Sequence, residues 1–106
     1  MLEVGKLARE LDRTIHERNR LAISILLYKR GKLSFKYLRR MLGISGGNLS
    51  THLRALERAG YVRVEKRFVG KKPHTEYSLT DKGKGVLKEH IKVLKKLIKA
   101  VEGTDP

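Results

Sequence analysis

Apolar residues recur at the spacing of amphipathic helices through most of the chain, which predicts five helices. Gly31 and Gly60 follow the second and the fourth of them, at positions where a residue with positive φ commonly ends a helix. Most of the chain is therefore expected to be helical. The expected helices span residues 1–15, 17–29, 34–42, 46–59 and 81–102.

Two segments between the last two helices alternate between apolar and polar residues, which is the pattern of half-buried β-strands. The first strand is expected over residues 61–69 and the second over residues 75–79. A loop with glycine and proline, residues 70–74, joins them, so the two strands should pair as a hairpin. The residues expected to face inward are Val62, Val64, Phe68, Tyr77 and Leu79.

The order of these elements is that of a winged helix-turn-helix. A tight break at residues 43–45 separates two short helices, a geometry that presents the second helix to the DNA major groove. The hairpin that follows would form the wing. We expect a mainly α (α+β) fold, a single domain over residues 1–106 with a two-stranded wing. Its parts are an N-terminal dimerisation helix (1–15), a winged helix core (16–80) and a C-terminal dimerisation helix (81–102).

The charge of the chain supports a polyanionic partner. Its 106 residues carry 25 lysines and arginines against 11 acidic residues, a net charge of +14, and the pI is about 10.4. No acidic residue lies between Glu17 and Glu57, so the two helices of the expected motif fall within a tract free of acids. Nucleic acid is the favoured partner, and an anionic membrane surface is the second possibility.

The second helix of the motif carries the candidate base-reading residues. Its leucines are spaced to face the core, which leaves small and hydrogen-bonding side chains on the other side. Asparagine can pair with adenine and arginine with guanine, while Ser45 also suits the N-cap. An ordinary polar helix face is the alternative. The candidate recognition residues are Ser45, Gly47, Asn48, Ser50, Thr51, His52, Arg54 and Arg58.

The wing and the first helix of the motif supply further cations. Pro73 fixes its own φ and biases the preceding residue toward extended geometry, so the tip of the wing should be stiff. A stiff cationic loop can follow a phosphate backbone or enter the minor groove, although a solvated hairpin tip is the alternative. The candidate wing residues are Arg67, Lys71, Lys72 and His74, and the candidate backbone contacts are Lys36 and Arg39.

Apolar stripes on the terminal helices need a partner, because the core between them offers a limited surface. In the last helix these positions follow a heptad spacing, which favours packing against another helix. The two helices could pack on each other within one chain, but a symmetric homodimer is the favoured arrangement. The candidate interface residues are Val4, Leu7, Leu11, Leu87, Ile91, Leu94, Ile98 and Val101.

Other classes of function find little support in the sequence. The chain has no cysteine, and its four histidines are not spaced with other ligands as in metal sites, so no metal is expected. No paired carboxylates, phosphate-binding loop or nucleophile with a base is visible, so neither enzymatic activity nor a cofactor is expected. The chain lacks a signal-peptide pattern and a membrane-spanning stretch, so we expect a cytoplasmic protein without a membrane partner.

The chain resembles the small winged helix-turn-helix transcriptional regulators of the MarR/ArsR-like type. The resemblance implies a dimer that binds operator DNA and usually represses transcription, with dimer contacts in the terminal helices. It places the recognition residues in 45–58 and the wing in 67–74. ArsR-type metal sensors carry a cysteine-containing motif that this chain lacks, and no effector pocket is indicated. The residues that carry the resemblance are IHERNRLAI (15–23), LSF (33–35), ISGGNLSTHL (44–53), LERAGYV (56–62) and KPHTEYSLTDKG (72–83).

The sequence thus predicts a transcriptional regulator that binds a pseudo-palindromic site on double-stranded DNA as a homodimer. The resemblance implies that it is a repressor. Two alternatives remain open. An architectural, chromatin-like protein would coat DNA with little sequence preference, and a protein-interaction module would bind no duplex at moderate salt.

Overall fold

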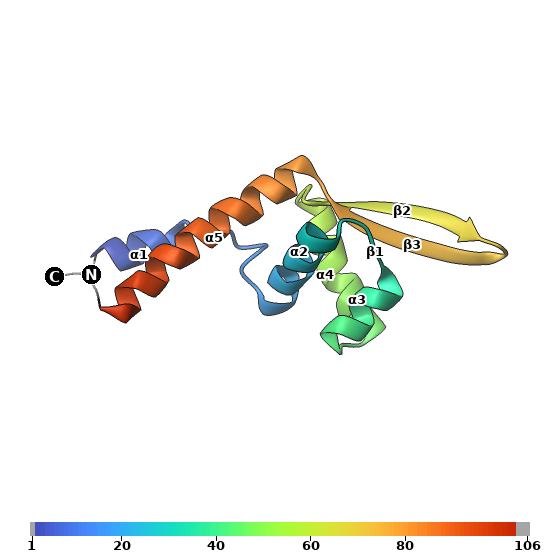
Figure 1. The fold of residues 1–106 in the computed structure, drawn as a ribbon, viewed down its shortest axis with the longest axis horizontal. Coiled ribbons are helices and arrows are strands. Elements are labelled where there is room, and N and C mark those ends of the chain that lie inside the picture. Colours follow the sequence, from blue (N-terminus) through green and yellow to red (C-terminus); the bar gives the residue numbers. More distant parts are fainter. Residues whose placement is uncertain (1, 104–106) are drawn as a thin grey trace.

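The computed structural model describes residues 2–103, which form five helices and three strands. The molecule is elongated, about 62 × 26 × 21 Å. The wing projects from one end and the two terminal helices lie at the other (Figure 1). The mainly α, winged helix fold class is confirmed. The elements are α1 (Leu2–Arg9), α2 (Arg18–Arg30), β1 (Leu33–Ser34), α3 (Phe35–Leu42), α4 (Gly46–Arg58), β2 (Val62–Val69), β3 (Lys72–Leu79) and α5 (Asp81–Glu102).

The core lies where α2, α3 and α4 meet the base of the sheet and the start of α5. Its side chains come from every one of these elements and are almost wholly removed from water. Fully burying a leucine or isoleucine stabilises a fold by about 1.5–3 kcal/mol, so this cluster is the main support of the winged helix. The core residues are Ile15, Ile23, Leu27, Leu38, Leu49, Leu53, Leu56, Tyr61, Val62, Tyr77, Leu79 and Leu87.

The sheet has three antiparallel strands in the order β1-β3-β2, where the sequence predicted two. β1 pairs Leu33 with Tyr77 and is two residues long, too short to show an alternating pattern. β3 begins at Lys72, so the loop shrinks to two residues with Gly70 at φ 66°. Pro73 is tolerated inside this strand because β1 ends before it, and one edge of β3 is unpaired there.

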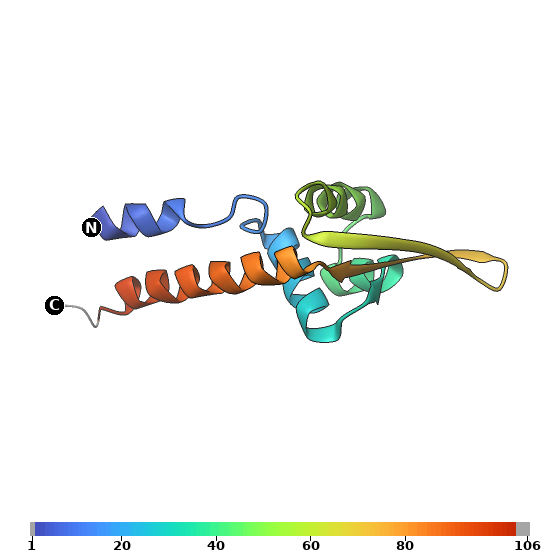
Figure 2. The ribbon, with the colours of Figure 1, turned by 90° about the horizontal axis from the view of Figure 1, so that it is seen from above.

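The expectation that Phe68 faces inward beside Val62 and Val64 is wrong. Phe68 is 73% exposed, whereas Val62 is buried and Val64 half-buried. The alternation itself is kept, but the hairpin runs past the helices, so the inward side has nothing to pack on near the tip (Figure 2). Tyr77 and Leu79, at the base of the same hairpin, are buried as predicted.

The sequence predicted that the first helix extends to Ile15, but this helix ends at Arg9. The carboxylate of Asp12 accepts hydrogen bonds from the backbone N–H groups of Thr14 and Ile15, both at 2.9 Å. An aspartate that bonds its own backbone in this way competes with helix formation. The resulting turn delivers Ile15 to the winged helix core, so Ile15 does not belong to the apolar face of the terminal helix.

The last helix has the predicted bounds, with Thr80 as its N-cap. α1 lies alongside it in both views, so the two helices do pack on each other within the chain (Figures 1 and 2). The buried face of α5 includes His90 and Val93, which lie beside the predicted heptad stripe. Of the predicted interface residues, one is buried (Leu87), four are half-buried (Leu7, Leu11, Ile91 and Leu94) and three are exposed (Val4, Ile98 and Val101). Within residues 2–103, no helix is both long and apolar enough to span a bilayer.

Candidate nucleic-acid interface

Serine caps and one glycine fix the helices on either side of the turn between α3 and α4. Ser34 caps α3, and its hydroxyl accepts the backbone N–H of Tyr37 at 3.1 Å. Gly43 ends that helix in the left-handed conformation, at φ 64°, which a residue with a side chain adopts at a cost. Ser45 then caps α4 by accepting the N–H of Asn48 at 3.1 Å. These bonds set the angle at which α4 leaves the turn.

One side of α4 is fixed in the core and the other side is exposed. Leu49, Leu53 and Leu56 are buried, as their spacing predicted. Within the part of the chain that the structure describes, α1 and most of α5 lie at the opposite end and leave the outer side free (Figure 1). Six of the eight predicted recognition residues are exposed: Ser45, Gly47, Asn48, Thr51, Arg54 and Arg58.

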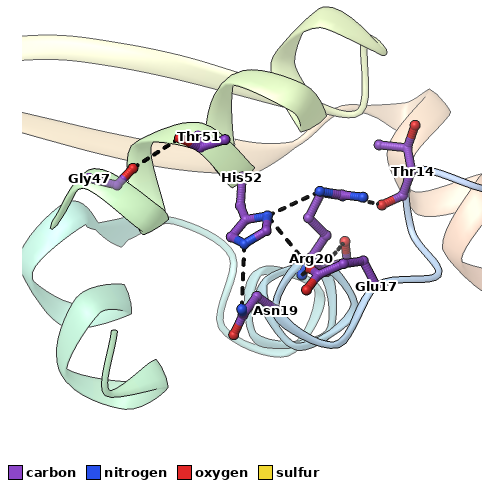
Figure 3. A network of polar contacts seen from close by, with 8 residues as sticks. Thr14, Glu17, Asn19, Arg20, Gly47, Thr51 and His52 are labelled. Atoms are coloured by element: carbon purple, nitrogen blue, oxygen red, sulfur yellow. Dashed lines mark hydrogen bonds and ion pairs between the residues drawn. The ribbon is translucent and has the colours of Figure 1, made fainter. Parts of the chain in front are cut away.

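His52 takes a different position from those six. Its ring points toward α2, where Arg20 Nη1 donates to His52 Nδ1 at 3.1 Å (Figure 3). The amide of Asn19 lies 3.4 Å from His52 Nε2, and the carboxylate of Glu17 lies 3.6 Å from Nδ1. The same arginine donates from Nε to the carbonyl of Thr14 at 2.6 Å. His52 therefore joins α4 to α2, and Ser50 beside it is half-buried.

This network, which sequence reasoning missed, has a weak signal in the sequence. His52 immediately precedes the buried Leu53 and lies three residues after the buried Leu49, so it falls at the border of the apolar face. Because Arg20 has no acceptor, its guanidinium can only donate in its contact with His52 Nδ1. The position of His52 suits a residue that orients α4.

The wing divides its predicted cations into two pairs. Arg67 and His74 lie opposite each other on β2 and β3, and both reach the carboxylate of Glu76, at 3.1 and 3.4 Å. This acid neutralises part of the charge of Arg67. Lys71 in the turn and Lys72 at the start of β3 are exposed, and among the wing's predicted cations they are the pair available to a phosphate backbone.

A groove of about 630 Å³ separates α4 from the hairpin. Ser50, Arg54 and Glu57 line it from α4, and Val64 and Lys66 line it from β2. The groove joins the outer side of α4 to the wing, so the two predicted DNA-binding parts form one continuous surface.

The two predicted backbone contacts lie on α3. Lys36 and Arg39 are both exposed. Arg39 also donates from Nε to the carbonyl of Ile44 at 3.4 Å, so this arginine braces the turn. Lys36 lines a hollow with Lys72 and His74 of the wing. The first helix of the motif thus adds cations beside both the turn and the hairpin.

Polar groups help to join α5 to this core. The buried His90 of α5, 2% exposed, accepts the backbone N–H of Asp12 on Nδ1 at 3.2 Å. Its Nε2 lies 3.2 Å from Nδ1 of His16. The hydroxyl of Tyr61, which follows α4, donates to the Asp12 carboxylate at 2.6 Å.

These contacts shift the titration of two groups. Burial lowers the pKa of His90, the nearby His16 lowers it further, and the charge of Asp12 opposes them. Burial, the hydrogen bond to Asp12 and the charge of Asp12 raise the pKa of Tyr61 to about 12. Both groups are therefore neutral at pH 7.

The sequence matches the family model of a winged helix DNA-binding domain over residues 19–98. The chain belongs to this family. An uncharacterized protein of Methanocaldococcus jannaschii is 34% identical to this winged helix protein over 83 residues, 78% of this chain and 90% of the relative.

Solved structures of regulators share the fold. A transcriptional regulator homologue from Pyrococcus horikoshii has a TM-score of 0.83 at 31% identity, over 95% of this chain and 98% of its own. A regulator of the MarR family from Enterococcus faecalis has a TM-score of 0.65 at 30% identity, over 84% of this chain and 76% of its own. The resemblance to MarR-like winged helix regulators is confirmed, and the protein is a DNA-binding transcription regulator.

Proposed function

We propose that this winged helix protein is a sequence-specific regulator that represses transcription by binding a pseudo-palindromic operator as a homodimer. The observation that carries the proposal is the outer side of α4, which is exposed and continuous with a cationic wing. A helix held by leucines on one side and exposed on the other fits the major groove of B-DNA. The repressing sign rests on the resemblance to MarR-type regulators.

Base reading falls to the first turns of α4 in this proposal. Asn48 is exposed one turn from the N-cap, and its amide can pair bidentately with an adenine. Arg54, further along the same helix, can pair with a guanine or bind a phosphate. The N–H groups at the start of α4 are suited to a phosphate, because the dipole of the helix favours an anion there.

The remaining cations of the surface would bind the phosphate backbone. Neutralising 6–10 phosphates lowers affinity by about 10³–10⁵-fold between 50 and 200 mM salt. The proposed backbone contacts are Lys36, Arg39, Arg58, Lys71 and Lys72, with Arg67 and His74 sharing the charge of Glu76.

A homodimer would cover the apolar side chains that α1 and α5 leave exposed. Ile98 and Val101 of α5 are 53% and 87% exposed, although α1 lies along the same helix. A second copy related by a twofold axis would bury these residues and present two α4 helices to one side of the duplex. Half-sites about one helical turn apart, ~34 Å, match such a dimer.

Selection of bound sequences from random duplexes tests sequence specificity. We expect a two-part consensus whose halves are related by a twofold axis, and competition by other genomic fragments at least about 10³-fold weaker. Asn48→Ala should relax the preference at one position of each half. Arg54→Ala should lower the salt dependence if it binds a phosphate, whereas Lys99→Ala, on the exposed part of α5, serves as the control.

An architectural DNA-binding role is the second candidate. It is favoured by the exposed lysines of α5, such as Lys92, Lys95 and Lys99, which extend the positive charge well beyond the proposed DNA-binding surface. A competition ratio near one for every fragment would support this role and refute the sequence-specific proposal.

A further inference from the structure

The end of the wing carries apolar side chains in the middle of its cations. Phe68 is 73% exposed and Val69 is 57% exposed. Arg67 precedes them, and the lysine of the turn follows. Phe68 is the most exposed aromatic side chain in the described part of the chain, although an exposed phenylalanine contributes little to the stability of the hairpin.

The register of the hairpin shows which way Phe68 faces. Residues directly opposite each other in an antiparallel pair share one face of the sheet, and successive residues alternate between faces. Phe68 pairs with Pro73, so these two lie on one face, together with Val64 and Lys66. Val64 and Lys66 line the groove beside α4, so Phe68 extends the face that borders the recognition helix.

Val69 lies on the opposite face of the same hairpin, where it pairs with Lys72. The face with Val69 also carries Arg67 and His74, which are held by Glu76. The two apolar residues are thus neighbours in sequence that point in opposite directions, and they make a matched pair for an experiment.

The hairpin also has the stiffness and the reach to place Phe68 in DNA. Its turn is two residues long, and Pro73 opposite Phe68 has a fixed φ. At about 3.3 Å per residue, Phe68 lies ~13 Å beyond Val64 along the strand. The minor groove that neighbours the major groove is half a helical turn away, ~17 Å, so a helix in one and the tip in the other are compatible.

We propose that Phe68, supported by Pro73, is an apolar wedge that enters the minor groove, unstacks one base step and bends the operator. The inference rests on the proposed binding of duplex DNA through α4. Apolar wedges of this kind kink a duplex by about 20–90°. The cations of the wing would hold the adjacent phosphates while the ring replaces the lost stacking.

The charge around Phe68 decides between DNA and a second copy of the chain as its occupant. Lys66 shares the face of Phe68, Lys71 lies in the adjacent turn, and each copy carries a net charge of +14. Two such tips repel one another, whereas a duplex attracts them. The wedge should also favour pyrimidine–purine steps at the flanks of each half-site, since TA and CA steps unstack most easily.

Energy transfer between dyes on the two ends of a selected duplex measures the bend, and 2-aminopurine at the flanking step reports unstacking. We expect the unaltered protein to raise both signals, Val69→Ala to match it, and Phe68→Ala to lose both. Phe68→Ala should bind about tenfold more weakly with an unchanged salt dependence. A mismatch at the flanking base step weakens stacking before the protein binds, so it should restore most of the affinity of Phe68→Ala. Phe68→Leu should retain part of the bend.

Binding of the duplex without bending or unstacking overturns the wedge and leaves the proposed regulator intact. The wedge is also overturned if Phe68→Ala bends DNA as the unaltered protein does. It is overturned as well if Phe68→Ala changes the oligomeric mass of the protein without DNA, because Phe68 would then belong to a contact between copies. Absence of duplex binding by the unaltered protein overturns the proposed function and the wedge together. Thermal unfolding of each variant confirms that the fold is retained.

Discussion

The recognition helix and the terminal helix α5 are joined to the molecule by different chemistry. α4 is held by Leu49, Leu53 and Leu56, which are buried among other apolar side chains. α5 also buries apolar side chains, Leu87 and Val93, but it adds close backbone packing at Gly83 and a histidine, His90, that is buried against polar groups. The leucine contacts of α4 carry no charge, whereas the contacts of α5 include a histidine whose pKa is lowered by burial.

This difference separates two tasks within one small domain. A DNA-reading helix needs a fixed orientation, which leucines in a close-packed core provide. α5 has, besides its apolar contacts, hydrogen bonds that connect it to Asp12 and, through Asp12, to Tyr61 beside the end of α4. A change at these contacts of His90, Asp12 and Tyr61, called the junction below, therefore affects the segment that follows the recognition helix.

Removing an apolar anchor of α4 should have the largest effect. Leu49→Ala creates a cavity at a fully buried position, and the free energy of unfolding should fall by about 2–5 kcal/mol. The loss should be the same at every pH, because no charged group is involved. Urea unfolding at two pH values measures it, with Met41→Ala on the exposed side of α3 as the control. A loss below that of the control would mean that α4 is not held by its leucines.

Two glycines of α5 test the close packing at the start of that helix. A Cβ on Gly83 would lie 2.2 Å from the carbonyl oxygen of Tyr61, so Gly83→Ala must push the helix away from the segment before β2. Overpacking of this kind costs about 1–3 kcal/mol. Gly85 has no described atom within 4 Å of its Cβ position, so Gly85→Ala should stabilise by up to about 1 kcal/mol.

The opposite signs of these two alanines are the decisive result, because the substitutions are chemically identical. Urea unfolding of both variants measures the difference in the free energy of unfolding. Equal values for Gly83→Ala and Gly85→Ala would show that α5 does not approach Tyr61 as the structure indicates.

The comparison also explains how much of the fold the sequence predicts. The apolar face of α4 and the bounds of α5 follow from spacing and from the caps Ser45 and Thr80, which act within a few residues of themselves. β1 was missed because two residues show no period, and its pairing with β3 is a long-range contact. Phe68 was predicted to face inward because the alternation of β2 is regular up to it, but the helices that would cover it end before this part of the strand.

The polar contacts could not be predicted from the sequence either, because they too join residues far apart in the chain. Asp12 ends α1 through a local turn, yet its bonds to His90 and Tyr61 join residues far apart in the chain. His52 lies at the edge of the leucine face, and the sequence does not show that Arg20 comes to meet it. A single sequence indicates which face of a helix is apolar, whereas the partner of a polar residue depends on the packing of whole elements.

The smallest expected effect concerns the pH dependence of the junction. His90 accepts a hydrogen bond from the N–H of Asp12, so a second proton on its Nδ1 would meet another donor. His16, in the turn before α2, faces His90. Tyr61, neutral at pH 7, is connected to His90 through its hydrogen bond to Asp12. Glu10, Arg13 and Glu89 line the adjoining cavity together with Asp12. Protonation of His90 therefore disfavours the folded state.

The sign follows from the lowered pKa of His90. Below the ordinary histidine value of 6.5 the unfolded chain binds this proton before the folded protein does, so stability falls as the pH falls through that window. The slope is at most about 1.4 kcal/mol per pH unit for one proton. Urea unfolding between about pH 5 and 7 measures it, and His90→Leu should be less stable at pH 7 but lose this part of the slope. His74→Asn, in the exposed wing, should keep it. If His90→Leu retained the full slope, the titrating group would lie elsewhere, and the contrast between the uncharged leucine contacts of α4 and the titratable histidine contact of α5 would fail.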